Sequence, residues 1–205
     1  TVDAIAWAHV SRSSTVDAIA WAHVSRSSTV DATEAQWAAH GVGANRLAFL
    51  ERNLRALAKA LGALGIPFTV LEAPRFRDAP GALLPWARAQ GAAALHFNDE
   101  YPLNERRRDD AVARAFAQAG VAVHRYTDSV IAAPGTLKTG QGGPYTVFTP
   151  FKRRWLATLD LPSAAPLAPP EPQGPVRPLA PALEEAMTLA GAAASAVPAK
   201  LWPGG

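Results

Sequence analysis

The sequence contains no cysteine and only one methionine among its 205 residues. The absence of cysteine excludes disulfide bonds, thiolate metal ligands and a cysteine nucleophile. No apolar run reaches the ~18 residues that a membrane-spanning helix requires, and the start of the chain lacks the basic-then-apolar pattern of a signal peptide. We therefore expect a soluble cytoplasmic protein that does not contact a membrane.

A strong charge of either sign is also missing. The formal net charge is +3 at pH 7, and so small a bias does not by itself indicate nucleic-acid binding. Hydrophobic residues make up 49% of the chain, which is enough for a packed core. Length and composition together predict one folded domain with additional segments at its ends.

An identical 14-residue repeat opens the chain. Residues 1–14 read TVDAIAWAHVSRSS, the same residues recur at 15–28, and a third copy begins at Thr29. Solenoid units are longer and tolerate drift, so the repeat indicates a recent duplication or an artefact of gene calling. The IAWAHV run in each copy fits a short strand or one turn of helix. We interpret His9 and His23 as copies of one incidental residue, and we predict no metal site.

Helices and strands alternate after the repeats. Leucines that alternate steps of three and four predict a helix over 44–64 with one face toward the core. Strands are predicted at 66–71, 92–97 and 121–126, and helices near 84–90, over 104–119, over 149–158 with Thr149 as N-cap, and weakly over 182–194. Alternation with short links predicts an α/β fold with right-handed crossovers and a Rossmann-like parallel sheet flanked by helices.

Composition divides the chain into three segments. Residues 1–32 form the tandem repeat segment, and residues 33–160 hold the α/β domain. Residues 161–205 are rich in proline and alanine, which is typical of a linker with partly polyproline II character.

The most informative stretch runs from Leu95 to Asp110. An apolar strand gives way to Asn98 and its acidic neighbours, Pro102 breaks the strand, and a helix follows. Asn104 and Glu105 therefore lie at a strand-to-helix junction, and such junctions line the carboxyl edge of a parallel sheet, where ligands bind. Helix capping by Asn104 and favourable charge at the helix start for Glu105 explain the same residues without a ligand.

Three motifs carry a family resemblance: YPLNER at 101–106, the Arg108-Asp109 pair, and PYTVFTPFK at 144–152. In this order and spacing they resemble the amino-terminal, light-harvesting domain of the DNA photolyase/cryptochrome family, over roughly residues 35–156. The resemblance implies a five-stranded parallel sheet ordered 3-2-1-4-5. It also implies a methenyltetrahydrofolate-type antenna contacted by Asn104 and Glu105, with His40 beside it. Other members of the family use a deazaflavin or a flavin instead.

The resemblance also implies a partner and an activity. The partner is the FAD-binding domain of a full-length deoxyribodipyrimidine photo-lyase, and damaged DNA is contacted only through that domain. We predict no catalytic residues here, because the FAD pocket and the DNA groove belong to the domain that this chain lacks. We therefore expect no DNA repair by the chain alone. The alternatives are the sensory domain of a cryptochrome-type photoreceptor, a stand-alone α/β module, or a non-functional truncated fragment.

The sequence departs from the family at its start. The first strand, with its Arg-Asp-Leu-Arg signature, is missing, and no clear second strand precedes Gln36. In the implied order these two strands lie in the middle of the sheet, and an unfilled gap exposes backbone groups at about 1–3 kcal/mol apiece when they are buried. We hypothesise that the two IAWAHV runs replace the missing strands and partly occupy the gap.

Overall fold

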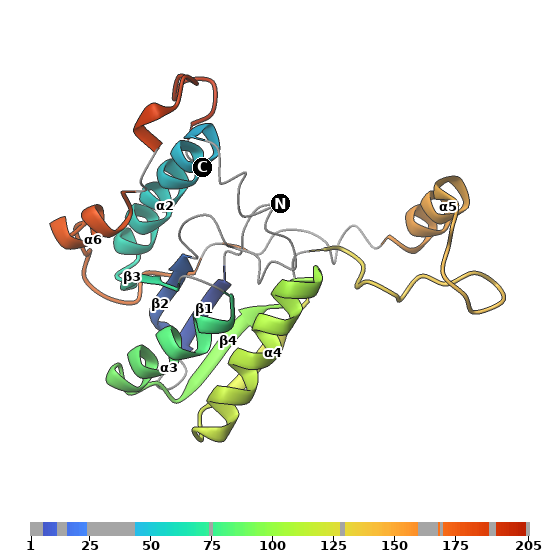
Figure 1. The fold of residues 1–205 in the computed structure, drawn as a ribbon, viewed down its shortest axis with the longest axis horizontal. Coiled ribbons are helices and arrows are strands. Elements are labelled where there is room, and N and C mark those ends of the chain that lie inside the picture. Colours follow the sequence, from blue (N-terminus) through green and yellow to red (C-terminus); the bar gives the residue numbers. More distant parts are fainter. Residues whose placement is uncertain are drawn as a thin grey trace.

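The computed structural model describes residues 6–11, 16–23, 44–73, 76–127, 130–159, 168, 170–188 and 192–203. A five-stranded sheet with helices on both faces forms the body of the molecule (Figure 1). The strands are β1 (Ala6–Ser11), β2 (Val16–His23), β3 (Phe68–Glu72), β4 (Ala94–Asn98) and β5 (Ala122–Tyr126). The helices are α2 (Ala44–Ala63), α3 (Ala79–Ala89), α4 (Leu103–Gln118), α5 (Phe148–Thr158) and α6 (Pro181–Ala186), with 3-10 turns η1 (Phe76–Asp78) and η2 (Ala192–Ala194).

The two repeat strands occupy the middle of the sheet. The strand order is β3-β2-β1-β4-β5, with β2 against β3 and β1 against β4. The hypothesis that the repeats enter the central gap is therefore confirmed. The expected α/β architecture, with parallel strands flanked by helices, is also present.

The direction of β1 corrects the expectation of an all-parallel sheet. β1 runs antiparallel to both of its neighbours, whereas β2 is parallel to β3 and β4 is parallel to β5. Only the four residues 12–15 separate β1 from β2. A parallel pair needs a crossover of a dozen or more residues. A link of four residues therefore allows only an antiparallel hairpin. The remaining four strands point the same way and share one carboxyl edge.

Strand register joins the repeats to the rest of the sheet. In the β1–β2 hairpin, Trp7 lies opposite Trp21, so the two copies pair about the same residue of the repeat. On the other side of β1, His9 lies opposite His96 and Val10 opposite Leu95 of β4. Each half of the sheet is thereby hydrogen-bonded to the other through β1.

Each face of the sheet has its own apolar cluster. One cluster lies between α3, α4 and strands β4 and β5, and its buried residues are Ala79, Leu83, Ala87, Leu95, Phe97, Val112, Phe116 and Val121. The other lies between α2 and β3, and its buried residues are Leu54, Ala58, Leu61, Ile66, Phe68 and Met187. Side chains alternate along a strand, so Leu95 and Phe97 face α3 and α4 while His96 faces the other way.

The leucine stripe of α2 packs as predicted. Leu54 and Leu61 are buried, and the helix matches the expected range to within one residue. The proline-rich segment folds back against the end of this helix. The Arg177 amide donates to the Gly62 carbonyl at 2.8 Å, and the chain passes close enough that a Cβ on Gly62 would clash with the Arg177 carbonyl.

Three predicted helix limits were wrong. α3 begins at Ala79 rather than near Leu84, because Pro80 occupies the start of the helix, where its missing N–H costs nothing. α5 begins at Phe148, so Thr149 is not its N-cap. The last helix ends at Ala186 rather than near 194.

The described helices include none that is long and apolar enough to cross a membrane.

Amide hydrogen exchange tests the central position of β1. Because β1 pairs on both sides, we expect amides of residues 6–11 to exchange at least ~100-fold more slowly than those of the exposed Gly140 and Gln141. The measurement is exchange on the full chain followed by NMR or mass spectrometry. Equal rates in the two segments would contradict the pairing of β1 with β2 and β4.

Candidate functional site

The start of α4 lies at the carboxyl end of β4. The Asp99 amide donates to the Tyr126 carbonyl at 2.8 Å, which continues the β4–β5 ladder by one residue before the chain turns. Pro102 precedes the helix, and the structure gives α4 no side-chain cap. Asn104 is half-buried in the first turn. The capping explanation for Asn104 is therefore wrong, and its amide group does not serve the helix start.

Glu105 is a buried carboxylate in the first turn of α4. Its exposed fraction is 5%. The N–H groups at the start of a helix favour a negative charge there. Burial is costly for a carboxylate unless it is hydrogen-bonded, so a ligand that offers N–H groups at this edge of the sheet would stabilise Glu105.

A buried ionic cluster holds the turn before α4. Arg108 and Asp109 are each 2% exposed. The Arg108 Nε and Nη2 groups donate to Asp109 Oδ1 at 2.9 and 2.7 Å, and Nη2 also donates to Glu100 Oε2. The Glu100 amide donates to Asp109 Oδ2 at 3.0 Å. These bonds tie the residues after β4 to the first turns of α4.

Burial is the main cause of the pKa shifts in this cluster. Loss of solvent raises the pKa of Asp109, although Arg108 opposes the shift. Burial also raises the pKa of Glu100 against the same Arg108, and the nearby charges of Asp109 and Glu105 add to the rise. Glu100 and Asp109 thus share one buried guanidinium, and together with the nearby charge of Glu105 they give this region an excess of negative charge when all three carboxylates are ionised.

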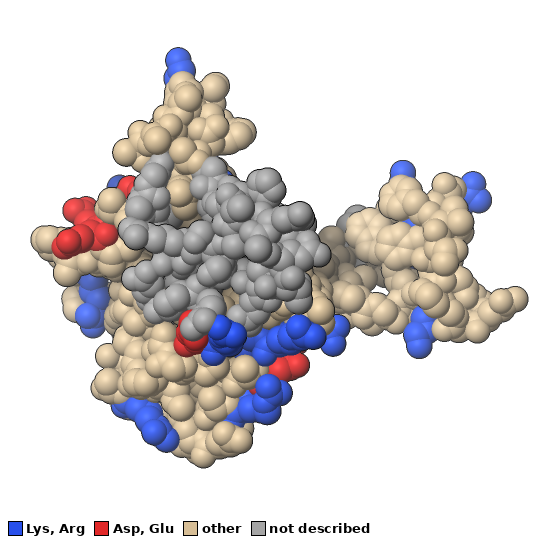
Figure 2. Space-filling model, in the orientation of Figure 1, with Lys and Arg blue, Asp and Glu red and all other residues tan. Residues whose placement is uncertain are grey.

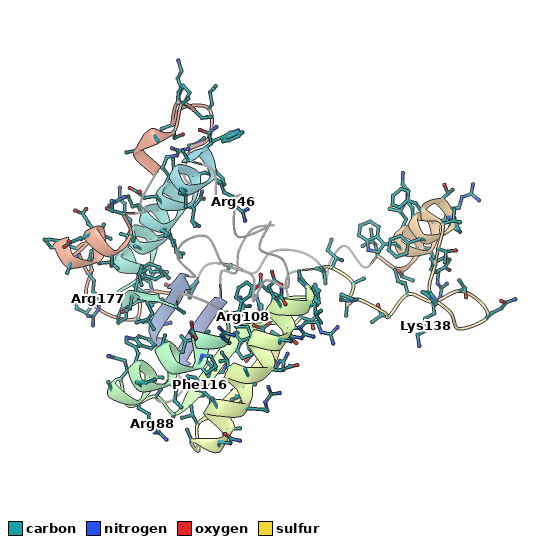
Figure 3. The ribbon with its side chains drawn as sticks, in the orientation of Figure 1. Arg46, Arg88, Arg108, Phe116, Lys138 and Arg177 are labelled. Carbon is teal, nitrogen blue, oxygen red and sulfur yellow. The ribbon has the colours of Figure 1, made fainter. Side chains whose placement is uncertain are left out.

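Two polar atoms in this stretch are buried without a partner. They are Nη1 of Arg108 and the hydroxyl of Tyr101. The guanidinium of Arg108 also lies over the Phe76 ring, 5.4 Å from its centroid, and Figure 3 shows its side chain between α4 and the strands. A buried unsatisfied donor costs about 1–3 kcal/mol. A ligand that offers acceptor atoms here would recover part of that cost.

The surface around the start of α4 is basic. Figure 2 shows Lys and Arg side chains gathered in this region, to which α4 contributes the exposed Arg106 and Arg107. The resulting positive potential favours the approach of an anionic ligand.

The structure places the three site residues predicted from the sequence differently. Asn104 and Glu105 are adjacent on α4 at the carboxyl edge, as expected. His40 lies outside the described residues. The buried roles of Arg108, Asp109 and Tyr101 were not predicted. A signal was present, because positions 105, 108, 109, 112 and 116 recur at helical spacing and extend the apolar face of α4.

Two other features do not contribute to this site. A cavity of about 200 Å³ lies between α2, the amino end of β3 and residues 177–183, at the opposite edge of the sheet. Among the side chains that the structure describes, no three histidine or acidic groups come together in a way that could hold a metal ion.

The sequence model of the DNA photolyase family matches residues 17–173, a range that includes the site and excludes β1. A deoxyribodipyrimidine photo-lyase of Salmonella typhimurium is 38% identical over 137 residues, which cover 66% of this chain and 28% of that protein. The protein of the same name from Escherichia coli K12 is 35% identical over 128 residues, covering 62% and 27%.

A solved structure gives the same correspondence. The crystal structure of a bacterial class III photolyase from Agrobacterium tumefaciens superposes with a TM-score of 0.53 at 26% identity. The matched region covers 64% of this chain and 28% of that chain. The chain therefore spans little more than a quarter of the length of the proteins described here.

Two adjacent aspartates test the buried cluster. We expect Asp109→Ala to lower the free energy of unfolding by about 3–5 kcal/mol, because it removes the carboxylate that accepts two of the bonds from the buried Arg108 guanidinium. The matched control is Asp110→Ala, which removes an ion pair to Arg125 from a side chain that is 47% exposed and should cost about 1 kcal/mol or less. Urea unfolding of the full chain gives both values. Equal costs for the two substitutions would contradict the role of the cluster.

Proposed function

Because the chain belongs to the DNA photolyase family, we propose that it is a light-harvesting, chromophore-binding domain of a deoxyribodipyrimidine photolyase. The observation that carries this proposal is the buried Glu105 carboxylate at the carboxyl edge of the sheet, beside two buried polar atoms that lack partners. A purely structural helix start does not require this combination. A polar, planar ligand at this edge accounts for it.

A methenyltetrahydrofolate-type chromophore suits these residues. Glu105 would accept two N–H bonds from the amino-pyrimidine edge of the pterin, and charge-assisted bonds of this kind are the stronger sort. Asn104 supplies a donor and an acceptor in one group. The Tyr101 hydroxyl and Arg108 Nη1 would donate hydrogen bonds to acceptor atoms on the ligand. The bound chromophore would supply an absorption band at longer wavelength than those of the tryptophans and tyrosines of the protein.

The proposed partner is the FAD-binding domain of a full-length photolyase. Its support comes from α5, which stands apart from the sheet and its flanking helices (Figure 1) and buries none of its residues. Val147, Phe148 and Leu156 are more than half exposed, and Phe148 reaches 71%. Several exposed apolar side chains on one short helix mark a surface for another protein. Damaged DNA would be contacted through the same partner domain.

Chromophore binding is tested by adding 5,10-methenyltetrahydrofolate to the purified chain. We expect a near-ultraviolet absorption band to accompany the protein through gel filtration. Glu105→Gln should weaken binding at least ~10-fold, because it removes the charge from the paired hydrogen bonds. Glu185→Gln changes an exposed carboxylate on α6 and should bind as the unmodified chain does.

The same experiment distinguishes the chromophore classes. Binding of a flavin or a deazaflavin in place of the folate would correct the chromophore and keep the light-harvesting role. If none of the three is retained, the proposed function is wrong.

The α5 surface is tested in a fusion of this chain to the FAD-binding region of the Salmonella typhimurium relative. Phe148→Ser should destabilise the fusion by about 1–3 kcal/mol, because it removes apolar area from the interface between the domains. In the chain alone the same change falls on an exposed side chain and should alter stability by about 0.5 kcal/mol or less. Thermal unfolding of both proteins gives the comparison. An equal effect in both would exclude α5 from the interface.

A further inference from the structure

A second arginine bridge lies at the carboxyl edge of the sheet, outside the buried cluster of Arg108. Arg125, near the end of β5, donates from Nε to Asp99 Oδ1 at 2.6 Å and from Nη1 to Asp110 Oδ1 at 2.7 Å. Asp99 is the first residue after β4, and Asp110 lies in the second turn of α4. One side chain of β5 therefore ties the end of the neighbouring strand to the helix that follows it.

The guanidinium of Arg125 lies on the face of the sheet that α4 covers. Its central carbon is 5.5 Å from the centroid of the Phe97 ring, and Phe97 belongs to the apolar cluster beneath α3 and α4. A guanidinium packs favourably over an aromatic face. The contact with Phe97 limits the orientations open to Arg125, so its two donors stay directed at the strand end and at the helix.

The two arginine bridges enclose the segment that carries the proposed ligand groups. The bridge through Arg108 starts one residue later in the turn than the bridge through Arg125, and the two end on adjacent residues of α4. Residues 101–108 lie between their ends and include Asn104 and Glu105. A single bridge would leave α4 able to rotate about it, whereas two bridges at different points fix the direction in which the helix leaves the sheet.

The bridge through Arg125 contributes geometry more than folding stability. Its three side chains are between 28% and 47% exposed, and ion pairs at such exposure add little to the free energy of unfolding. The Arg108 side chain, by contrast, is 2% exposed. Hydrogen bonding from Arg125 lowers the pKa of Asp110, so this carboxyl group is ionised at neutral pH and the bridge persists there.

We propose that Arg125 is a positioning residue of the chromophore site. Its bridge to the helix fixes the orientation of the first turns of α4, and with it the placement of Asn104 and Glu105. Groups that are held in place before a ligand arrives bind it more tightly, because less conformational freedom is lost on binding. Arg125 acts through these residues and not by contact with the ligand. This inference rests on the proposed function and adds to it a residue of a different strand.

Arg125→Gln separates positioning from folding stability. Binding of 5,10-methenyltetrahydrofolate to the full chain should weaken at least ~5-fold, whereas the midpoint of thermal unfolding should fall by about 4 °C or less. The matched control is Arg88→Gln, which removes an exposed guanidinium from the last turn of α3, at the amino edge of the sheet (Figure 3), and should change neither quantity. Unchanged affinity in Arg125→Gln would overturn the proposal, and so would a loss of affinity that follows from unfolding of the chain.

Arg125→Lys distinguishes the bridge from the positive charge. Lysine keeps the charge, but its single ammonium lacks the planar fork with which arginine reaches two carboxylates. Affinity should therefore fall as it does in Arg125→Gln. Asp110→Ala breaks the bridge from the helix side and should give the same loss, with no further loss when it is combined with Arg125→Gln. Full affinity in Arg125→Lys would show that charge alone attracts the ligand and would overturn the proposal.

NMR spectra of the chain without chromophore give a readout that does not depend on binding. The amide signals of residues 103–106 should shift in Arg125→Gln and stay in place in Arg88→Gln, because only the first change releases α4. Unshifted signals in both variants would overturn the role of Arg125. If the unmodified chain bound no chromophore, the proposed function would be wrong, whereas these spectra would still decide whether Arg125 positions the start of α4.

Discussion

The pairing of β1 with β4 is the contact on which the sheet depends. Strands β2 and β3, with α2 packed against β3, and strands β4 and β5, covered by α3 and α4, are joined through β1. An unfilled middle would leave two strand edges exposed, and such edges are sites of aggregation. The repeat hairpin fills this position, at the cost of one antiparallel strand among four parallel ones. The four parallel strands keep their shared carboxyl edge, and with it the place where a ligand binds.

The carboxyl edge of the sheet combines a rigid turn with buried polar atoms that lack hydrogen-bond partners. Arg108 and Asp109 bond to each other and to Glu100, so the turn between β4 and α4 is held in one conformation. Buried ion pairs of this kind contribute little net stability compared with apolar packing, because their desolvation is costly. Here the cluster fixes the position of Asn104 and Glu105. Polar groups that are already held in place lose little conformational entropy when a ligand binds to them. This rigidity accords with the proposed chromophore site.

One surface extends the proposed function beyond this edge. Under that proposal the apolar side of α5 would contact a second domain, and its separation from the sheet leaves it accessible to one. This surface accords with relatives more than three times as long as the matched region.

Local patterns in the sequence predicted many of the helices and strands of this fold. The leucine spacing of α2 and the apolar runs of β3, β4 and β5 predicted these elements, because amphipathic periodicity reports which side of a segment faces the core. The placement of Asn104 and Glu105 followed from the strand-to-helix junction. Helix limits were less predictable, as Thr149 shows, because helix ends fray and local signals place them only to within one or two residues.

Tertiary structure decided what depends on contacts between distant segments. Within the run Arg106 to Asp110 every residue is charged, and helical spacing indicates only that Arg108 and Asp109 share the side of α4 that carries Val112. Their contacts with Phe76 and Glu100 accompany their burial, while Arg106 and Arg107 are exposed. The sequence by itself determined two identical repeats and a link of four residues between their strands. Which strands the two repeats pair with is set by tertiary structure, because hydrogen-bonded pairing joins residues that no local pattern connects.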